Sequence, residues 1–472
     1  MILPVGFAAT LRELVGPDYV REDAASLATY GQDALLQVHP PALVVLPADT
    51  ADVSRIAALC NTGRVPLVVR GAGTGYTGGA VPTEGGIVLS MERLNRILEI
   101  DQENLLAVVE PNVITADLQR AVEQVGLFYP PDPASLEQSS LGGNVAECAG
   151  GPRAFKYGTT KRYVLALEAV LASGEVIRTG SKAVKNVVGY DLTQLLVGSE
   201  GTLAIITKIT LRLVPKPPDR ATVAAAFASI TDAVDAVTAL IERRVVPAAI
   251  ELIDDESLVA AALHSGVQVA PPGARALLIV ECDGIPAAVQ DELSLVIRAC
   301  ETAGVMSVRR ASTEADRAEL WAVRRQISLA LRATGLLKIN HDVVVPRGRV
   351  PQLYDAVEDL RQTFGLRVAA FGHAGDGNIH VNLMVDRQKP AELARARKAE
   401  RVLFQRVLAL EGSISGEHGI GYAKKPYLAM ELSADVIALM QRVKVAFDPN
   451  NILNPGKIFP ETGRSVRTID GE

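Results

Sequence analysis

A glycine-rich loop in the first third of the chain restricts the fold more than any other feature. Residues 71–79 read G-A-G-T-G-Y-T-G-G and follow the apolar run P-L-V-V-R, which favours a strand. Glycines let a backbone approach an anion closely, so that successive N–H groups can surround a phosphate. In a Rossmann fold such a loop runs directly into a helix. Here it continues past Pro82 to a second strand pattern, G-I-V-L-S-M, which argues against an NAD site of that type.

Two other regions share this small-residue character. One combines P-P-D-P-A-S (130–135) with L-G-G-N-V-A-E-C-A-G-G (141–151), and the other is G-S-E-G-T-L (198–203). Taken alone, residues 71–79 could be a connection without any ligand. Three such loops in one domain instead favour a long phosphate-bearing cofactor that lies along the fold.

The periodicity of apolar residues predicts an α+β protein rather than a doubly wound sheet. The proline-rich segment 215–219 divides the chain, because stacked prolines stop both helices and strands. Before it we expect a helix over 115–125 with Thr115 as its N-cap, and strands near 42–47, 66–70, 86–91, 105–111, 165–173, 175–178 and 203–214. After it we expect helices near 230–244, 286–303, 315–334, 350–364 and 390–411, and strands near 276–282, 338–345, 366–372 and 379–385.

Three of the six histidines lie in one stretch near the C-terminal end, within G-H-A-G-D-G-N-I-H and G-E-H-G-I-G. Asp376-Gly377 is a strong signal for a two-residue hairpin turn. Such a turn would pair Gly375 with Asn378 and His373 with His380. Directly opposed residues share a face, with Cβ atoms ~4.5–5.5 Å apart, which suits two ligands of one ion. Two histidines on a surface hairpin are the alternative interpretation.

A third ligand must come from a separate segment, and Glu417 is the candidate. Two imidazoles and a carboxylate bind a catalytic divalent metal with an open position, which indicates Zn²⁺, Mn²⁺ or Fe²⁺. His418 then remains as a base near the metal.

The expected helix over 315–334 also carries a candidate anion-binding group. Arg324 and Ser328 are four residues apart and so share a helical face, and Lys338 begins the next expected strand. A guanidinium group favours a bidentate carboxylate. Arg325 and Arg332 compete for the same role.

Together these motifs resemble the FAD-linked oxidases of the vanillyl-alcohol-oxidase and p-cresol-methylhydroxylase type. The resemblance covers nearly the whole chain, including K-Y-G, S-G-E-H-G-I-G and L-N-P-G-K. The histidine motifs resemble the D-2-hydroxy-acid dehydrogenase branch, which includes the FAD subunit of glycolate oxidase, cytochrome-type D-lactate dehydrogenase and D-2-hydroxyglutarate dehydrogenase. The resemblance implies a two-part FAD-binding domain over 1–217, an α/β substrate (cap) domain with the metal site over 218–420, and a segment over 421–472 that returns to the FAD domain.

The same resemblance implies which residues contact FAD. The 71–79 loop would hold the pyrophosphate, residues of 131–144 would lie along the flavin and ribityl chain, and residues near 201–206 would lie near the adenine. Some relatives attach the flavin to a histidine four residues after the loop's arginine, where this chain has Thr74, so we expect non-covalent FAD. The implied residues are Arg70, Gly71, Ala72, Gly73, Thr74, Gly75, Thr77, Gly78, Gly79, Pro131, Asp132, Ser135, Gly142, Gly143, Asn144, Gly201, Ile206 and Asn454.

For the reaction, the resemblance implies oxidation of a D-2-hydroxy acid such as glycolate, D-lactate or D-2-hydroxyglutarate to the 2-oxo acid, with hydride transfer to flavin N5. His373, His380 and Glu417 would bind the metal, and His418 would be the base. The substrate would contact Arg324, Ser328, Lys338 and Asn382. Ser328 stands where some relatives have threonine, and K-I-N-H-D replaces their aromatic residues. The resemblance therefore does not predict the distal part of the substrate pocket.

Other function classes compete with this reading. A metal-dependent hydrolase without flavin, a flavin oxidase of a non-acid alcohol and a non-catalytic scaffold subunit are the alternatives. The net charge of −6 argues against nucleic-acid binding, and no apolar run approaches the roughly 20 residues of a membrane span.

Four scattered cysteines without C-x-x-C spacing argue against disulfides and an iron–sulfur cluster, and the N-terminal sequence does not read as a signal peptide. We therefore expect a cytoplasmic enzyme, with attachment to the inner face of the membrane through a partner left open. Its electrons would pass to a quinone, a cytochrome, an electron-transfer flavoprotein or an iron–sulfur subunit. A homodimer and a hetero-complex both stay open.

Overall fold

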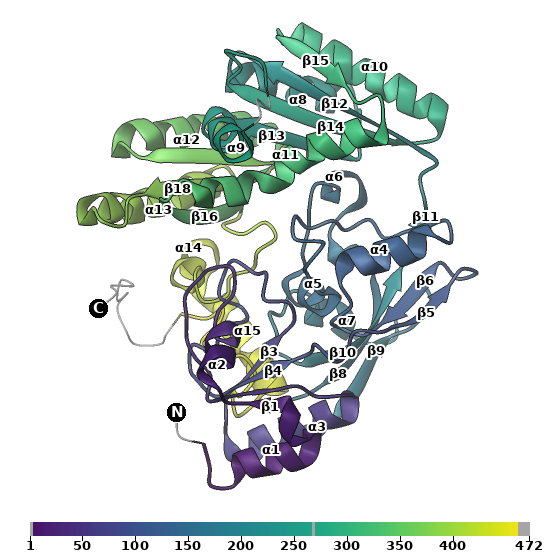
Figure 1. The fold of residues 1–472 in the computed structure, drawn as a ribbon, viewed down its shortest axis with the longest axis vertical. Helices are drawn as coiled ribbons and strands as arrows, with labels where there is room; N and C mark the ends of the chain where they lie inside the picture. The colour runs from purple at the N-terminus through teal and green to yellow at the C-terminus, as the bar shows by residue number, and fades with distance from the viewer. Residues whose placement is uncertain (1–2, 267–269, 461–472) are drawn as a thin grey trace. The chain divides into compact units, whose positions relative to one another are not determined.

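The computed structural model describes residues 3–266 and 270–460, and the chain divides into two compact units. The first comprises residues 1–149, 159–216 and 417–472, and the second comprises 150–158 and 217–416. Residues 461–472 of the C-terminal segment lie outside the described residues. Figure 1 labels the helices and strands of both units.

The first unit contains a mixed sheet and an antiparallel sheet. The mixed sheet has the order β1-β2-β4-β3, with β2, β4 and β3 parallel, and the antiparallel sheet has the order β5-β6-β10-β8-β9. Its strands are β1 (Val20–Arg21), β2 (Leu43–Val45), β3 (Leu67–Arg70), β4 (Ile87–Ser90), β5 (Ile97–Asp101), β6 (Leu106–Val109), β7 (Leu127–Phe128), β8 (Val164–Val170), β9 (Val176–Gly180), β10 (Ile205–Arg212) and β11 (Val214–Pro215). Its helices are α1 (Phe7–Val15), α2 (Ala24–Tyr30), α3 (Thr50–Gly63), α4 (Thr115–Glu123), α5 (Leu141–Glu147), α7 (Leu192–Leu196), α14 (Leu428–Glu431) and α15 (Ala434–Phe447).

Helices α1 and α3 pack on the mixed sheet and form its core with residues of β2, β3 and β4. Asp49 caps α3, because its side chain accepts a hydrogen bond from the N–H of Asp52. The C-terminal segment joins this core. The N–H of Leu67 donates to the carbonyl of Ile452, and that of Asn454 donates back to Leu67. The chain end therefore supports β3, the strand that enters the glycine loop.

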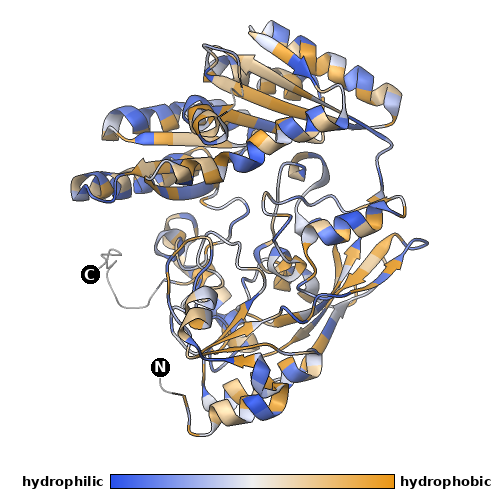
Figure 2. Ribbon diagram, in the orientation of Figure 1, coloured by the Kyte–Doolittle hydropathy of each residue, from blue (hydrophilic) through white to orange (hydrophobic). Residues whose placement is uncertain are grey.

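The second unit is built on one antiparallel sheet of order β15-β12-β14-β13-β17-β18-β16. Its strands are mostly apolar, whereas its helices alternate polar and apolar residues (Figure 2). The strands are β12 (Asp219–Phe227), β13 (Ala249–Asp254), β14 (Ala276–Gly284), β15 (Ser307–Arg310), β16 (Leu337–Val344), β17 (Arg367–His373) and β18 (Asn378–Val385). The helices are α6 (Ala154–Tyr157), α8 (Ile230–Glu242), α9 (Asp255–Ser265), α10 (Pro286–Thr302), α11 (Glu314–Ala333), α12 (Val350–Phe364) and α13 (Pro390–Ala409).

Strand register divides the side chains of this sheet between two faces. Phe371 on β17 pairs with His380 on β18 and with Ile253 on β13, so these three residues share a face. Helices α9 and α11 pack on that face, around a core that includes Phe371 and Trp321. Alternation along the strands brings Glu251, His373, Asn382, Asp342 and Lys338 to the same face.

The hairpin between β17 and β18 differs from the sequence-based expectation, so the predicted register is wrong. His373 pairs with Asn378, and Phe371 pairs with His380. The loop contains four residues, 374–377, because the N–H groups of Asp376 and Gly377 both bond back to the carbonyl of His373 and the Asp376 side chain accepts from the N–H of Asn378. The shift is two residues, one full period of the pleat, so His373 and His380 still share a face.

Most predicted elements of the second unit are confirmed to within two or three residues, including α8, α10, α11, α12 and β18. The N-cap prediction for α4 is wrong. Ile114 occupies that position without a side-chain cap, and the hydroxyl of Thr115 is buried and donates to the carbonyl of Ser139. Strands β12, β13 and β15 and helix α9 were not expected from the sequence.

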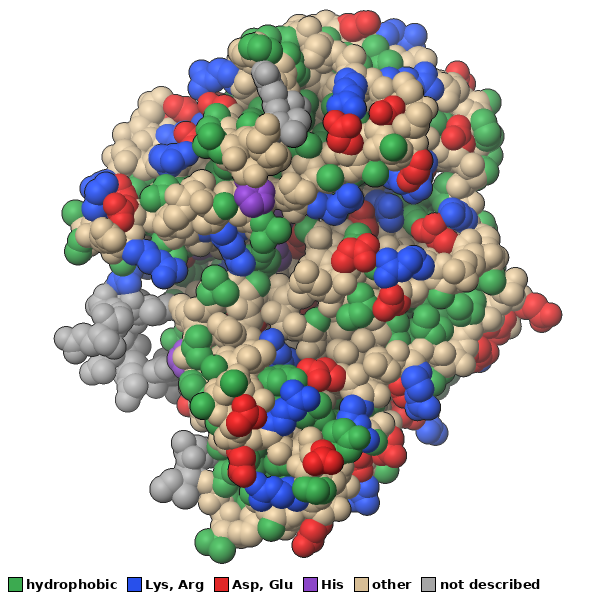
Figure 3. All heavy atoms as spheres, in the orientation of Figure 1, with side chains coloured by type: hydrophobic (Ala, Val, Ile, Leu, Met, Phe, Trp, Pro, Cys, Tyr) green, Lys and Arg blue, Asp and Glu red, His purple; other side chains and the backbone are tan. Residues whose placement is uncertain are grey.

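The described surface carries charged side chains of both signs. On the face in Figure 3, acidic and basic side chains are interspersed over the described surface. Among the described residues, no helix combines the length and the apolar character needed to cross a membrane.

The four-residue hairpin loop depends on Gly377, which leads to a first prediction. Gly377 has φ +88°, and a Cβ atom there would lie 2.0 Å from the carbonyl oxygen of Val345. We expect Gly377→Ala to lower the free energy of unfolding by ~2–4 kcal/mol, which combines backbone strain with the steric clash. Denaturant unfolding measures the change. Gly335→Ala is the matched control, because Gly335 has φ +79° and open space around it, and it should cost only ~1 kcal/mol. Equal losses in both variants would contradict this account.

Candidate active site

The glycine loop after β3 is packed so tightly that side chains are excluded at several positions. A Cβ atom on Gly73 would lie 2.2 Å from the Arg70 guanidinium, and one on Gly71 would lie 2.1 Å from Oγ of Ser140. Gly75 is different, because a Cβ there would meet only Asp33, at 3.9 Å. The loop therefore has a closed side held by the protein and an open side at Gly75, which fits a backbone cradle for an anionic ligand.

Ser140 joins this loop to the second small-residue region. Its hydroxyl accepts hydrogen bonds from the N–H groups of Ala72 and Gly143, both at 3.3 Å, and it also caps α5. Gly142 packs against Pro111, where a Cβ would lie 2.6 Å away. Two regions that were expected to contact one cofactor are thus brought side by side by a single side chain.

The remaining expected cofactor residues lie in the same unit. The Asn454 amide donates to the carbonyls of Gly79 and Glu200, so it connects the glycine loop to the G-S-E-G-T-L turn. Arg70 donates to the carbonyl of Gln32, and the Asn144 amide donates to Thr115. Further expected residues are placed as follows: Pro131 accepts from Gln119, Asp132 is buried, Gly201 has φ +66°, Ile206 is buried in β10, and Thr74, Thr77, Gly78 and Ser135 lie in the loops.

His418 is held against the glycine loop within the first unit. Its ring stacks on Tyr76, with centroids 5.2 Å apart and an interplanar angle of 21°. The Thr77 hydroxyl donates to its backbone carbonyl. Two and three residues further on, the N–H groups of Ile420 and Gly421 donate to the buried carboxylate of Glu200, at 2.7 and 2.6 Å. The candidate base is therefore attached to the cofactor-binding unit by both its ring and its backbone.

The three candidate metal ligands are brought together. The ligand atoms of His373, His380 and Glu417 all lie within 4.8 Å of one another. The two histidine rings are perpendicular, with centroids 5.4 Å apart, and both are buried. In the described part of the chain this is the one set of three potential metal-binding side chains at such distances. Two imidazoles and one carboxylate fit a divalent ion with an open coordination position.

Glu417 is positioned through the residue before it. The N–H of Gly416 donates to the carbonyl and to Oδ2 of Asp342, both at 3.0 Å. Asp342 lies in β16, directly opposite His380 in β18. Gly416 also packs against Asn378, where a Cβ would lie 2.2 Å from its amide. Because Gly416 has no side chain, the backbone at this residue can pack against Asn378 of β18. Glu417 is the next residue in the chain.

A buried carboxylate supports the first histidine. Glu251 on β13 pairs across the sheet with His373, and its Oε1 lies 2.5 Å from Nδ1 of the ring. Its other oxygen accepts from Nε of Arg324. Burial raises the pKa of Glu251, but the charges of Arg324 and His373 outweigh it and keep the pKa below its usual range. A carboxylate at Nδ1 leaves Nε2 as the candidate metal-binding atom of His373.

The candidate anion-binding residues lie on the same face. Arg324 is buried, its guanidinium lies 4.8 Å from the centroid of Phe371, and its Nη2 has no hydrogen-bond partner among the described residues. Lys338 donates to the Ser328 hydroxyl at 2.5 Å. Burial lowers the pKa of Lys338 to about 7, and the charges of Arg332 and Arg324 add to this shift.

Asn382 has most of its hydrogen-bonding capacity used within the sheet. Its amide donates to the carbonyls of Ala369 and His380, and its oxygen accepts from Asn340. It is fully buried. The structure therefore places this residue next to His380 and shows it as a support for the two strands.

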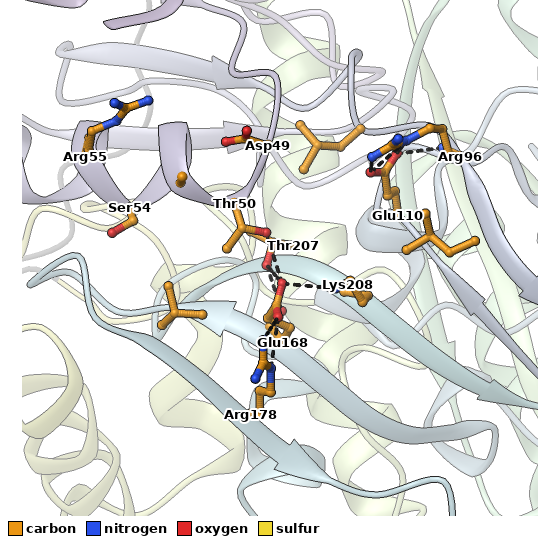
Figure 4. A pocket seen from close by; sticks show the side chains of 14 residues that line it. Asp49, Thr50, Ser54, Arg55, Arg96, Glu110, Glu168, Arg178, Thr207 and Lys208 are labelled. Atoms are coloured by element: carbon orange, nitrogen blue, oxygen red, sulfur yellow. Dashed lines mark hydrogen bonds and ion pairs between the residues drawn. The ribbon is translucent and has the colours of Figure 1, made fainter.

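The first unit contains a pocket of about 820 Å³ (Figure 4). Its charged groups neutralise one another. Glu168 accepts from Arg178 and Thr50, and Glu110 pairs with Arg96. Burial raises the pKa of Glu168, yet the hydrogen bonds from Arg178 and Thr50 outweigh it and keep its pKa lowered. The pocket contains none of the residues singled out in the sequence, and its paired charges indicate a stabilising ion network.

Several residues of the site were missed from sequence. Glu251 lies inside the apolar run A-I-E-L-I, and a charge within a buried strand signals a paired group. Glu200 and Tyr76 lie inside the glycine-rich motifs, where attention went to the glycines. Their contacts with the 417–421 segment link residues more than 200 positions apart and have no local signal.

Comparison with known proteins shows the family. The model of the FAD-binding domain matches residues 41–180, and that of the C-terminal domain of FAD-linked oxidases matches residues 216–458. The glycolate oxidase subunit GlcD of Bacillus subtilis is 42% identical over 96% of this chain and 97% of that subunit. A D-lactate dehydrogenase of Anaerostipes hadrus is 36% identical over 95% of both chains.

Solved structures confirm the predicted fold class. p-Cresol methylhydroxylase superposes with a TM-score of 0.79 at 19% identity over 98% of this chain and 99% of that one. A 4-ethylphenol oxidase from Gulosibacter chungangensis gives a TM-score of 0.77 at 23% identity over 98% of this chain and all of the other. With the cradle of glycine loops and the family matches in agreement, the chain belongs to the FAD-linked oxidase family and is an FAD-dependent oxidoreductase.

Proposed function

We propose that this enzyme oxidises a D-2-hydroxy acid to the 2-oxo acid with the help of a divalent metal held by His373, His380 and Glu417. The observation that carries this proposal is the convergence of these three ligand atoms within 4.8 Å. His373, His380 and Lys338 share a sheet face, and Arg324 on α11 contacts Glu251 of that face. A metal ligand set beside buried cations suits a substrate with a hydroxyl group next to a carboxylate. The names of the relatives, glycolate oxidase subunit and D-lactate dehydrogenase, support the same substrate class.

In this proposal, different residues bind the metal, bind the substrate carboxylate and accept the hydroxyl proton. His373, His380 and Glu417 would hold a metal that polarises the substrate hydroxyl, and FAD in the first unit would supply the hydride acceptor at N5. Arg324 and Lys338 bind the carboxylate, with Ser328 orienting the Lys338 ammonium group. His418 accepts the hydroxyl proton, since it follows Glu417 directly and its Nε2 lies 3.9 Å from that carboxylate. Asn382 holds the strands that carry His380 and thereby keeps the ligand in place.

Non-covalent FAD, Zn²⁺ as the metal and an external electron acceptor complete the proposal. The residue four positions after Arg70 is Thr74, which cannot attach a flavin as histidine does. Two imidazoles and one carboxylate suit Zn²⁺, with Mn²⁺ and Fe²⁺ as the alternatives. The described cysteines are all free, which suits a reducing compartment such as the cytoplasm. A relative named as a subunit favours a hetero-complex that carries electrons away.

Anaerobic bleaching of the flavin tests the proposal directly. We expect D-lactate, glycolate or D-2-hydroxyglutarate to bleach the absorbance of the purified holoenzyme near 450 nm, while aryl alcohols leave it unchanged. Removal of the metal with a chelator should slow the bleaching by ~100-fold or more, and added Zn²⁺ or Mn²⁺ should restore it. Rapid bleaching by an aryl alcohol would overturn the proposal. So would full activity of a chelated enzyme that metal analysis shows to be free of metal.

The role of His418 gives a second prediction for this site. His418→Ala removes the base and should slow flavin reduction by ~10²–10⁴-fold at saturating substrate. Bound FAD should stay at wild-type levels, because the backbone contacts with Thr77 and Glu200 do not need the ring. Stopped-flow reduction and the ratio of flavin to protein absorbance measure both. His264→Ala, on the second unit's α9, is the control and should change neither. Undiminished reduction in His418→Ala would remove this residue from the mechanism.

The lowered pKa of Lys338 predicts a pH dependence for substrate binding. The ammonium form attracts a carboxylate, so affinity for unreactive oxalate should fall as the pH rises through about 7, by up to ~10-fold per pH unit. Spectral titration of the holoenzyme from pH 6 to 9 measures this. Lys338→Met should bind oxalate weakly at pH 6, and its affinity for oxalate should no longer fall as the pH rises through about 7. Identical slopes in wild type and variant would show that another group is responsible.

A further inference from the structure

Glu251 contacts two residues to which the proposed function gives different tasks. Oε1 lies 2.5 Å from Nδ1 of the candidate metal ligand His373, and Oε2 accepts from Nε of the candidate substrate-binding residue Arg324. The carboxylate has no exposed surface. Both of its oxygens are thus used, one for each partner, in a part of the protein that excludes water.

The fold explains why these contacts are well defined. Glu251 and His373 are a directly opposed pair across β13 and β17, so their side chains leave the sheet side by side. Helix α11 crosses the same face, and the guanidinium of Arg324 lies between Glu251 and the ring of Phe371. Strand register fixes one partner of Glu251, and helix packing fixes the other.

We propose that Glu251 is a positioning residue of this reaction. It holds the Nδ1 hydrogen of His373, so that the Nε2 lone pair points to the metal, and with its second oxygen it orients Arg324 for the substrate carboxylate. This inference rests on the proposed function, and it adds a link between metal and substrate. A ligating histidine whose other nitrogen donates to a carboxylate is a better metal ligand, and loss of such a partner costs 10–100-fold in affinity.

A link of this kind has a thermodynamic consequence. The same carboxylate serves both partners, so metal binding at His373 and anion binding at Arg324 influence each other, and the influence is reciprocal. Metal in the triad should therefore tighten binding of an unreactive anion such as oxalate. The opposing possibility is that Glu251 serves only as the counter-ion that lets Arg324 be buried.

Glu251→Gln tests the proposal, because an amide keeps the shape but has one acceptor in place of two and no charge. We expect affinity for Zn²⁺, measured by competition with a chromophoric chelator, to fall 10–100-fold, while the flavin spectrum stays unchanged. The chain offers a matched control on the neighbouring strand. Glu281 on β14 is also buried and accepts from Trp321 and Arg317 of the same helix. Glu281→Gln should change Zn²⁺ affinity less than threefold.

A double variant separates the two roles of Glu251 and guards against misfolding. Glu251→Gln/Arg324→Met also removes the buried arginine that Glu251→Gln alone would leave without a counter-ion, so the protein should fold, as thermal melting checks. A positioning role predicts that Zn²⁺ affinity stays 10–100-fold low in this variant. Return of the affinity to within threefold of wild type would show a counter-ion only and overturn the inference. A wild-type protein that binds no Zn²⁺ or Mn²⁺ at the triad is a different result, because it removes the proposed function itself.

Discussion

The antiparallel register of β13, β17, β18 and β16 is the constraint on which the candidate active site depends. It sets Glu251 opposite His373 and Asp342 opposite His380, so each candidate histidine ligand has a carboxylate on the adjacent strand. The Glu251 carboxylate contacts Nδ1 of His373. The Asp342 carboxylate accepts a hydrogen bond from the N–H of Gly416, the residue before Glu417. A slip of one residue would send these side chains to the opposite face and separate the ligands entirely.

The polar groups on this face are buried beneath α11, and their stability follows from pairing. Arg317 and Arg324 are seven residues apart on the helix, two turns, and they meet Glu281 and Glu251 on neighbouring strands. An isolated charge in such a place costs several kcal/mol, whereas a hydrogen-bonded pair roughly offsets its own desolvation. These pairs therefore add little net stability, but they hold a few side chains in defined geometry. Such geometry is what a catalytic site requires.

Much of the architecture was predictable because it rests on local patterns. Long amphipathic helices such as α11 and α13 were found to within two residues, and the division at 215–219 follows from prolines. The candidate metal ligands could be singled out because histidine is rare in this chain and these histidines lie among glycines. The pairing of β13 with β17, and hence Glu251, joins segments about 120 residues apart without a sequence signal. The hairpin register failed because Asp376 made an Asx-type turn inside a longer loop.

The segment from Gly416 to Gly421 has an unusual arrangement of attachments. The N–H of Gly416, its first residue, donates to Asp342 in β16, and the N–H groups of Ile420 and Gly421, its last two residues, donate to Glu200. Between these anchors stand a candidate ligand and a candidate base, one after the other. An added or deleted residue here would move both the Glu417 carboxylate and the His418 imidazole from their positions. Surface loops tolerate changes in length far better. The length of this short peptide is therefore fixed by the hydrogen bonds at its two ends.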